Sequence, residues 1–405
     1  MQTVLPKKRL LVNLKIVERC NLNCTYCYFF NGEDQSYQSH PKHLSKNMVL
    51  KIAAYLKQGC EELKVTELTL IFHGGEPLIY SKAHFDWMCT LFSETFNSST
   101  TIRYSLQTNG TLINEQWANL LLKHNVGVGI SLDGPEIYND KYRIDHRNFG
   151  SYQSVITGLK KLKDGFKDKS NSIGALCVIN PEFSADIIYK HLAKDLRLKS
   201  FDFIIPDYHY DNPPPFPAKK YGEYLIDLFH AWISDEVDNE SEEVELRIMS
   251  SSVGRFFGFS SLLYGSGKSD NNQLLPLITI SSNGDLSPLD ELRTTDPKFR
   301  ESRKNIENTS LKDFFALPLF NIIEQATNTL SKKCQECCWS EICEGGGLVN
   351  RYRTENKFDN PSIYCEGLML FYSHVAKYLL ENGFPFEEMK RNLKLQEEKE
   401  VETII

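Results

Sequence analysis

The sequence predicts an α/β fold in which parallel strands and crossover helices form a partial barrel of six strand–helix units. Two observations support this. Short runs rich in β-branched and aromatic residues alternate with longer segments through the first half of the chain. The longer segments carry apolar residues at the helical spacing of about 3.6. The expected strands are Leu11–Val17, Glu67–Phe72, Ile102–Gln107, Val126–Leu132, Ile173–Ile179 and Phe201–Ile205.

The expected helices lie between these strands, so each strand returns to the sheet through a helix. They are Met48–Gln58, Ala83–Phe96, Glu115–His124, Tyr152–Leu162 and Ala185–Leu196. In parallel barrels the chemistry gathers at the carboxyl ends of the strands. We therefore expect functional side chains in the segments that directly follow the strands.

Four segments at such strand ends have unusual composition. Adjacent glycines, Gly74 and Gly75, allow the backbone to approach a ligand closely. Glu76 can accept hydrogen bonds from a cationic amine. Taken alone, each segment after the second, third and fourth strands also fits an ordinary turn. The four segments are Cys20–Cys27, His73-Gly74-Gly75-Glu76-Pro77, Gln107-Thr108-Asn109-Gly110 and Ser131-Leu132-Asp133-Gly134-Pro135.

The cysteines after the first strand have the spacing Cys-x3-Cys-x2-Cys, at Cys20, Cys24 and Cys27. Three thiolates at this spacing supply a four-iron cluster and leave one iron open to a substrate or cofactor. Zinc is the alternative, but zinc prefers four closed ligands. The nearby histidines, His40 and His43, flank a proline in a polar stretch. The spacing therefore favours iron and sulfur.

Composition indicates a soluble cytoplasmic enzyme. The 405 residues are 41% hydrophobic and 24% charged, enough for one large core and a smaller domain. No apolar run approaches the roughly 20 residues needed to span a bilayer, and Met1–Lys8 does not resemble a secretory signal. A net charge of −7 without a basic stripe disfavours nucleic acid as a partner. Eleven cysteines in such a protein indicate metal rather than disulfides.

A second group of cysteines lies near the end of the chain. Cys334, Cys337, Cys343 and Cys365 offer four thiolates, enough to close a second cluster completely. Four thiolates also suit zinc. A neighbouring thiol, Cys338, is expected to be a packed residue rather than a ligand.

The first cysteine motif resembles that of the radical S-adenosylmethionine (SAM) superfamily. The resemblance implies a [4Fe-4S] cluster on Cys20, Cys24 and Cys27, with SAM bound to the open iron. It implies contact of Gly74, Gly75 and Glu76 with the SAM amino group, and of Arg143 with the methionine carboxylate, which arginine can grip in bidentate fashion. Further SAM contacts are expected from Tyr26, Gln107, Asn109 and Ser131.

The second cysteine group resembles the SPASM extension of radical SAM enzymes that modify peptides and proteins. A complete extension binds two auxiliary clusters. Here Gly347 stands where one ligand is expected, and Leu277–Glu291 contains no cysteine. The resemblance therefore implies one auxiliary [4Fe-4S] cluster, on Cys334, Cys337, Cys343 and Cys365.

The most specific resemblance runs from Gly345-Gly346-Gly347 through Asn350-Arg351-Tyr352-Arg353 to Phe358–Cys365. It is to the maturases of the XYE, Grr and Fxs ribosomal peptide systems, which form three-residue cyclophanes. This implies a carbon–carbon bond between an aromatic ring and the β-carbon of a residue two positions later. The implied partners are a precursor peptide and an electron donor such as flavodoxin or ferredoxin.

Restoring aromaticity in that reaction releases a ring proton, and Asp290 is the expected base. It follows the hairpin-like turn Ser282–Asp285, at a position resembling the catalytic aspartate of anaerobic sulfatase-maturating enzymes. An ordinary loop carboxylate is the competing interpretation. A sulfatase-type oxidation of Cys or Ser to formylglycine, another peptide maturation, and a zinc-stabilised peptide-binding module stay open as alternative functions.

Four regions are expected along the chain. The radical SAM partial barrel covers residues 1–210, and a linker and helical bridge covers 211–270. The SPASM-like domain covers 271–372, and a helical tail covers 373–405.

Overall fold

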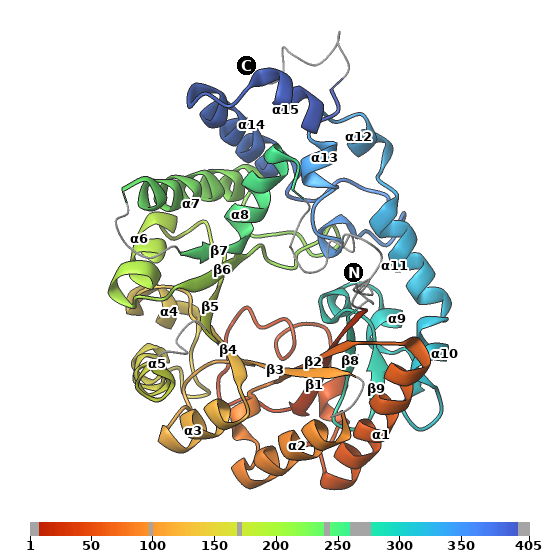
Figure 1. Ribbon diagram of the computed structural model, residues 1–405. Coiled ribbons are helices and arrows are strands. Elements are labelled where there is room, and N and C mark those ends of the chain that lie inside the picture. The colour runs from red at the N-terminus through yellow and green to blue at the C-terminus, as the bar shows by residue number, and fades with distance from the viewer. Residues whose placement is uncertain (1–7, 97–99, 168–171, 239–243, 260–276, 396–405) are drawn as a thin grey trace, which may run out of the picture. The chain divides into compact units, whose positions relative to one another are not determined.

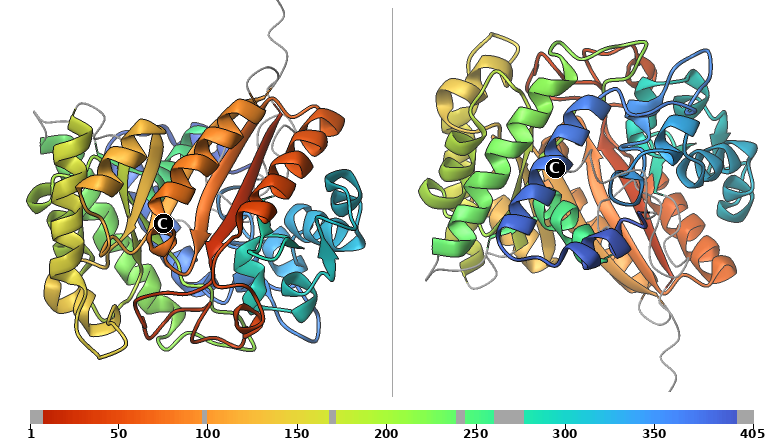
Figure 2. Two further views of the ribbon diagram at one scale, coloured as in Figure 1. Left: turned by 90° about the horizontal axis from the view of Figure 1, so that it is seen from below. Right: turned by 90° about the horizontal axis from the view of Figure 1, so that it is seen from above.

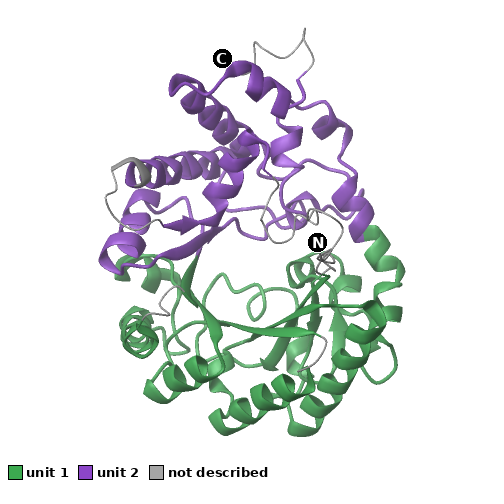
Figure 3. Cartoon of the chain, viewed as in Figure 1, with its two compact units in different colours: residues 1–176, 271–322 green, residues 177–270, 323–405 purple. Residues whose placement is uncertain are grey.

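The computed structural model describes residues 8–96, 100–167, 172–238, 244–259 and 277–395. The chain divides into two compact units, each built from two separate stretches (Figure 3). Unit 1 comprises residues 1–176 and 271–322, and unit 2 comprises residues 177–270 and 323–405. The region boundaries at 210, 270 and 372 stay predictions. Parts of the predicted bridge and tail, residues 260–276 and 396–405, lie outside the described residues.

Unit 1 is built on the predicted parallel sheet. Its first strands pair side by side in chain order, and all of them lie where the sequence places them. The structure extends several of these strands by one or two residues. The strands are β1 (Arg9–Val17), β2 (Glu67–Gly74), β3 (Thr101–Thr108), β4 (Val126–Ser131) and β5 (Ile173–Val178), at which the first stretch of the unit ends.

Helices cover one face of this sheet (Figures 1 and 2). The side chains of Ser45, Ser81 and Asn114 cap the first three helices by accepting a backbone N–H in the first turn. A short helix between β4 and the fifth helix was not predicted. The helices of this stretch are α1 (Lys46–Leu63), α2 (Lys82–Thr95), α3 (Glu115–Lys123), α4 (Glu136–Tyr142) and α5 (Tyr152–Phe166), with short turns η1 (Ser36–Gln38) and η2 (Pro77–Ile79).

The second stretch of unit 1 extends the sheet on the other side of β1. Strand β8 (Ile278–Ile280) pairs in parallel with β1 and antiparallel with β9 (Asp285–Ser287). The intervening turn confirms the predicted hairpin, and Gly284 at φ +87° provides its left-handed residue. The stretch continues through η6 (Asp290–Thr294), α9 (Pro297–Arg300), β10 (Lys304–Asn305), α10 (Leu311–Phe315) and the start of α11 (Pro318–Asn328).

Unit 2 contains the last predicted strand, β6 (Ser200–Ile204), in parallel with β7 (Glu245–Leu246). The predicted helix Ala185–Leu196 is α6 (Ala185–Lys190) followed by a π-helical turn, η4 (His191–Asp195). Among the described helices, none combines the length and apolarity needed to cross a bilayer. The other elements are α7 (Ala218–Asp238), α8 (Arg247–Gly254), η5 (Arg255–Phe257), α12 (Lys332–Gln335), α13 (Ser340–Cys343), η7 (Val349–Arg351), α14 (Cys365–Glu381) and α15 (Phe386–Asn392).

Candidate functional site

The three cysteines of the first motif lie on the loop that leaves β1, and their thiols are partly buried. Burial raises the pKa of Cys20 to about 12, and the negative charges of Glu76, Cys24 and Cys27 contribute to this shift. These thiols are therefore close enough to interact electrostatically. A bound metal centre would reverse the shift, because coordination deprotonates a thiol.

The geometry of the described residues does not favour a single metal ion. Within this part of the chain, no three His, Cys, Asp or Glu side chains converge to hold one ion. An iron–sulfur cluster makes no such demand, because each of its irons takes a separate thiolate.

Arg143 is buried beside the cysteine loop. Its Nη1 donates to the hydroxyl of Tyr26 at 2.7 Å, and that hydroxyl donates to Asp133. Burial lowers the pKa of Arg143, but the nearby Tyr26, Cys24 and Asp133 raise it by more, so the net shift is upward. Nε of Arg143 is shielded from solvent and has no hydrogen-bond partner among the described residues. An unpartnered buried donor beside the loop fits a carboxylate ligand.

Glu76 is fully buried and makes several backbone contacts. Its carboxylate accepts hydrogen bonds from the backbone N–H of Leu78 at 2.9 Å and of Asn109 at 2.7 Å, and from the hydroxyl of Thr108 at 2.7 Å. Burial raises its pKa, although these hydrogen bonds oppose the shift. In this arrangement Glu76 fixes the loop after β3 against the loop after β2.

The remaining predicted SAM contacts also lie at the strand ends. The side-chain amide of Asn109 donates to Asn21 at 2.9 Å and lies 3.8 Å from the sulfur of Cys20. Gln107 donates to the hydroxyl of Ser131 at 2.9 Å. Cys20, Glu76 and Asn109 thus form one connected group, and Arg143 and Tyr26 form another around Cys24.

The two adjacent glycines contact protein backbone. Gly74 has φ +123°, and a Cβ on it would overlap the carbonyl oxygen of Val17. A Cβ on Gly75 would overlap the carbonyl oxygen of Arg19. Both glycines therefore allow β2 to stay paired with the chain as it enters the cysteine loop, where Gly75 N–H donates to Val17 at 2.8 Å.

Arg143→Lys is expected to weaken SAM binding by about tenfold or more, because lysine cannot reproduce the planar, bidentate grip on a carboxylate. Calorimetric titration of the reconstituted chain with SAM measures this. Arg147→Lys, at an exposed position on the same loop, is the matched control and should bind SAM as the wild type does. Equal affinity of both variants would show that Arg143 does not contact the carboxylate.

Asp290 lies at the start of η6 and is 5% exposed. Its carboxylate forms an ion pair with Lys15 at 3.0 Å, lies 3.6 Å from Nε of Arg293, and accepts a hydrogen bond from Tyr28 at 2.8 Å. Burial alone would raise the pKa of Asp290, but the positive charges of Lys15 and Arg293 bring it below its ordinary value. The predicted base is therefore a carboxylate held in its ionised form by neighbouring positive charges, and its Oδ1 accepts no hydrogen bond from the described residues.

Sequence reasoning missed the residues that surround Asp290. Lys15 is 1% exposed on β1, and its ammonium lies 3.9 Å from the ring centre of Phe29. His73 lies at the end of β2, in register with Lys15 on the neighbouring strand. A detectable signal for Lys15 was a charge in the interior of a mainly apolar strand, because a charge buried in such a strand requires a partner.

The second cysteine group is gathered in unit 2. Burial raises the pKa of Cys343 to about 12, and Cys365, Cys334 and Cys337 add to the shift, so the four predicted ligands lie near one another. The motif residues around them shape the loop. Arg351 is 2% exposed and donates to the carbonyl groups of Ala326, Thr329, Phe358 and Asn360. Cys338 is buried next to the group.

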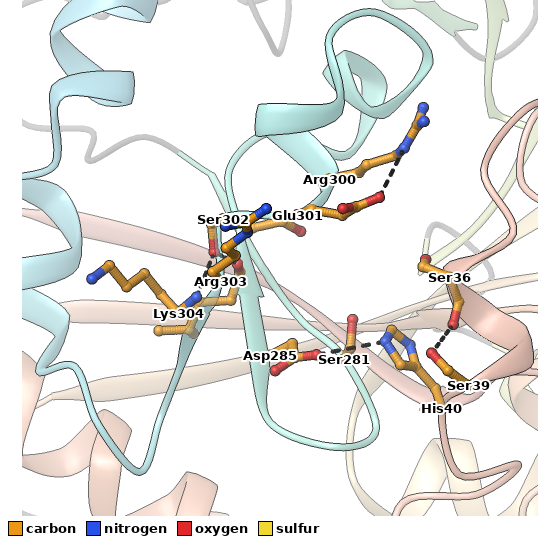
Figure 4. Close-up of a pocket in the computed structure, with 12 residues that line it drawn as sticks. Ser36, Ser39, His40, Ser281, Asp285, Arg300, Glu301, Ser302, Arg303 and Lys304 are labelled. Atoms are coloured by element: carbon orange, nitrogen blue, oxygen red, sulfur yellow. Dashed lines mark hydrogen bonds and ion pairs between the residues drawn. The ribbon is translucent and has the colours of Figure 1, made fainter.

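Unit 1 also has a polar pocket of about 310 Å³ (Figure 4). His40 points across it toward Asp285, and its hydrogen bonds to Asp285 and Glu18 raise its pKa to about 9 against the effect of burial. Both charge signs line the pocket, as Arg300 pairs with Glu301 there. None of the predicted ligands or catalytic residues lines it, so this pocket is not the site where they converge.

Residues 14–187 match the radical SAM superfamily model, and this segment contains the cysteine loop and all the predicted SAM contacts. The chain therefore carries a radical SAM domain. Enzymes with this domain use a [4Fe-4S] cluster and SAM. It is 29% identical to the cysteine-type anaerobic sulfatase-maturating enzyme of Clostridium novyi, over 89% of this chain and 95% of the relative. It is 22% identical to the serine-type enzyme of Bacteroides thetaiotaomicron, over 89% and 87% of the two chains.

The solved structure of native anSMEcpe with bound AdoMet superposes with a TM-score of 0.79 at 22% identity, covering 92% of this chain and 98% of that one. This likeness confirms the predicted fold, a radical SAM α/β domain followed by an extension. Streptococcus suis SuiB superposes with a TM-score of 0.57 at 16% identity.

Proposed function

We propose that this protein is a radical SAM maturase that oxidises a residue of a peptide or protein at its β-carbon. The observation that carries the proposal is the presence of two separate cysteine groups in one chain. One is the three-cysteine loop beside the unpartnered Nε of Arg143, and the other is the gathered set of Cys334, Cys337, Cys343 and Cys365. Relatives that match nearly the whole chain are named as protein-maturating enzymes, which supports a polypeptide substrate.

When bound, the cluster and SAM supply a 5′-deoxyadenosyl radical that removes hydrogen from an unactivated carbon. The residues of this chain bind and orient the reactants. Arg143 holds the carboxylate of SAM, while Glu76 keeps the loop of Asn109 in place beside Cys20. Cys334, Cys337, Cys343 and Cys365 would hold an auxiliary cluster, which would supply an acceptor for one electron of the substrate. A proton must also leave the substrate, and one of the side chains at or around Asp290 would receive it.

Two products are compatible with this proposal. The names of the relatives favour formylglycine, made from Cys or Ser. The cysteine count favours a three-residue cyclophane, because the second set closes one cluster and Leu277–Glu291 has no cysteine for another. The same stretch from Gly345 to Cys365 that resembles the cyclophane maturases forms the loop held by Arg351.

Mass spectrometry of the product separates the two. The anoxically reconstituted chain is supplied with dithionite, SAM and the Cp18Cys peptide that is bound in an anSMEcpe structure. It is also co-expressed with any short peptide that a reading frame beside its gene encodes. Exchange of a cysteine sulfur for oxygen together with loss of two hydrogens indicates formylglycine, whereas loss of two hydrogens alone, with a ring-to-Cβ bond, indicates a cyclophane. Absence of deoxyadenosine under every condition contradicts the proposed function.

A further inference from the structure

Lys15 and His73 face the same side of the sheet in unit 1. They are register partners on the parallel strands β1 and β2, as are their predecessors Leu14 and Phe72. Phe72 packs against Phe85 of α2, with ring centres 4.9 Å apart, so Phe72 faces the helices. Because side chains alternate along a strand, Lys15 and His73 point to the opposite face. Asp290 meets them there through its ion pair with Lys15.

The Asp290 carboxylate is poorly suited to accept a proton. It is already stabilised in its ionised form by Lys15, Arg293 and the hydroxyl of Tyr28. A group whose pKa is lowered in this way is a weak base, whereas proton transfer is efficient when the pKa of the acceptor lies near the working pH.

The imidazole of His73 differs from the Asp290 carboxylate in its hydrogen bonding and in its ordinary pKa, which is 6.5 against 3.8. It is partly buried at the carboxyl end of β2, directly before Gly74. Its Nδ1 is shielded from solvent and has no hydrogen-bond partner among the described residues. Burial lowers the pKa of His73, the charge of Asp290 opposes that shift, and Lys15 reinforces it. The ring is therefore neutral at physiological pH, and its Nδ1 makes no hydrogen bond within the described residues.

We propose that the imidazole of His73, rather than the carboxylate of Asp290, accepts the proton that leaves the substrate. The inference rests on the proposed function. In the step, an X–H bond of the substrate radical breaks, where X is the ring carbon for a cyclophane or the sulfur or oxygen for formylglycine. The proton passes to His73, the bonding pair stays on the substrate, and the one excess electron leaves to an iron–sulfur acceptor. Asp290 is a positioning residue that stabilises the resulting imidazolium.

The charged groups that face His73 come from two sides. Lys15 lies on β1, and Glu18 directly follows that strand. Asp290 lies on η6, where its carboxylate is 3.6 Å from Nε of Arg293. Protonation of His73 removes the acceptor, so product formation should decline as the pH falls through the pKa of His73, which is below the ordinary 6.5. Generation of deoxyadenosine should not share that decline.

Nuclear magnetic resonance of the reconstituted full chain with 13C-labelled histidine tests the charge state without a substrate. The His73 signal is assigned by its loss in His73→Gln. It should titrate below 6.5, move to higher pH in Lys15→Met and move to lower pH in Asp290→Asn. Lys51→Met, an exposed lysine paired with Glu307, should leave it unchanged. The proposal is overturned if the pKa of His73 is 6.5 or higher, or if it changes in neither Lys15→Met nor Asp290→Asn.

The second measurement is product formed per deoxyadenosine, with the Cp18Cys peptide and with the co-expressed peptide as probes. His73→Gln should lower this ratio by about 100-fold or more, the typical contribution of a general base, while deoxyadenosine still forms. A ratio within about twofold of the wild type assigns the proton to another group and overturns the proposal. Failure of the wild type to form deoxyadenosine contradicts the proposed function, and the titration then tests the charge state of His73 by itself.

Discussion

Replacing Cys20, Cys24 and Cys27 together with alanine should abolish deoxyadenosine formation and remove half of the bound iron. Two four-iron clusters give about eight irons per chain, and the variant should retain about four. The physical reason is that SAM would be cleaved only at the iron that these three proposed ligands would leave open. Iron and sulfide analysis after anoxic reconstitution, together with chromatography of the SAM products, measures both effects.

Cys60→Ala is the matched control for this triple variant. Cys60 is buried in α1, in neither cysteine group, and burial raises the pKa of its thiol to about 12. This variant should keep about eight irons and full SAM cleavage. Deoxyadenosine at the wild-type rate from the triple variant would contradict the assignment of the radical cluster.

Cys343→Ala should separate SAM cleavage from product formation. The variant should lose the auxiliary cluster and retain about four irons, because Cys343 is one of the four proposed ligands of that cluster. Deoxyadenosine should still form, but the processed peptide should be absent, since the substrate radical can no longer pass its electron onward. Anoxic turnover with parallel assays of deoxyadenosine and peptide mass measures the separation.

The neighbouring thiol provides the control for Cys343→Ala. Cys338 is buried and is predicted to be a packed residue, so Cys338→Ala should keep both clusters and form product. If Cys338→Ala loses iron while Cys343→Ala does not, Cys338 replaces Cys343 in the ligand set.

The strands and the first cysteine loop were predictable because their signals are local. Each strand from β1 to β6 is a short apolar run, and hydrophobic periodicity identified it to within one or two residues. The placement of Arg143 beside Tyr26 and Cys24 follows from the same architecture, in which parallel strands end at one edge of the sheet.

The surroundings of Asp290 were not predictable, because they depend on pairing between distant parts of the chain. Lys15 and Asp290 form an ion pair only after β8 pairs with β1, and β8 has three residues and no distinctive pattern. The pKa of a carboxyl group is set by the charges around it, which the sequence does not reveal. Asp290 was therefore identified by position, while its ionised state and its neighbour His73 required the structure.

The parallel pairing of β8 with β1 has a consequence for the order in which the protein is made. Strand β1 leaves the ribosome before Ile278–Ile280 has been synthesised, so during that interval one of its two edges lacks its β8 neighbour. During that interval its backbone N–H and C=O groups on that side are open to pairing with other chains. A nascent chain of this protein therefore exposes an unpaired strand edge until β8 has been made, and chaperones are suited to cover such an edge.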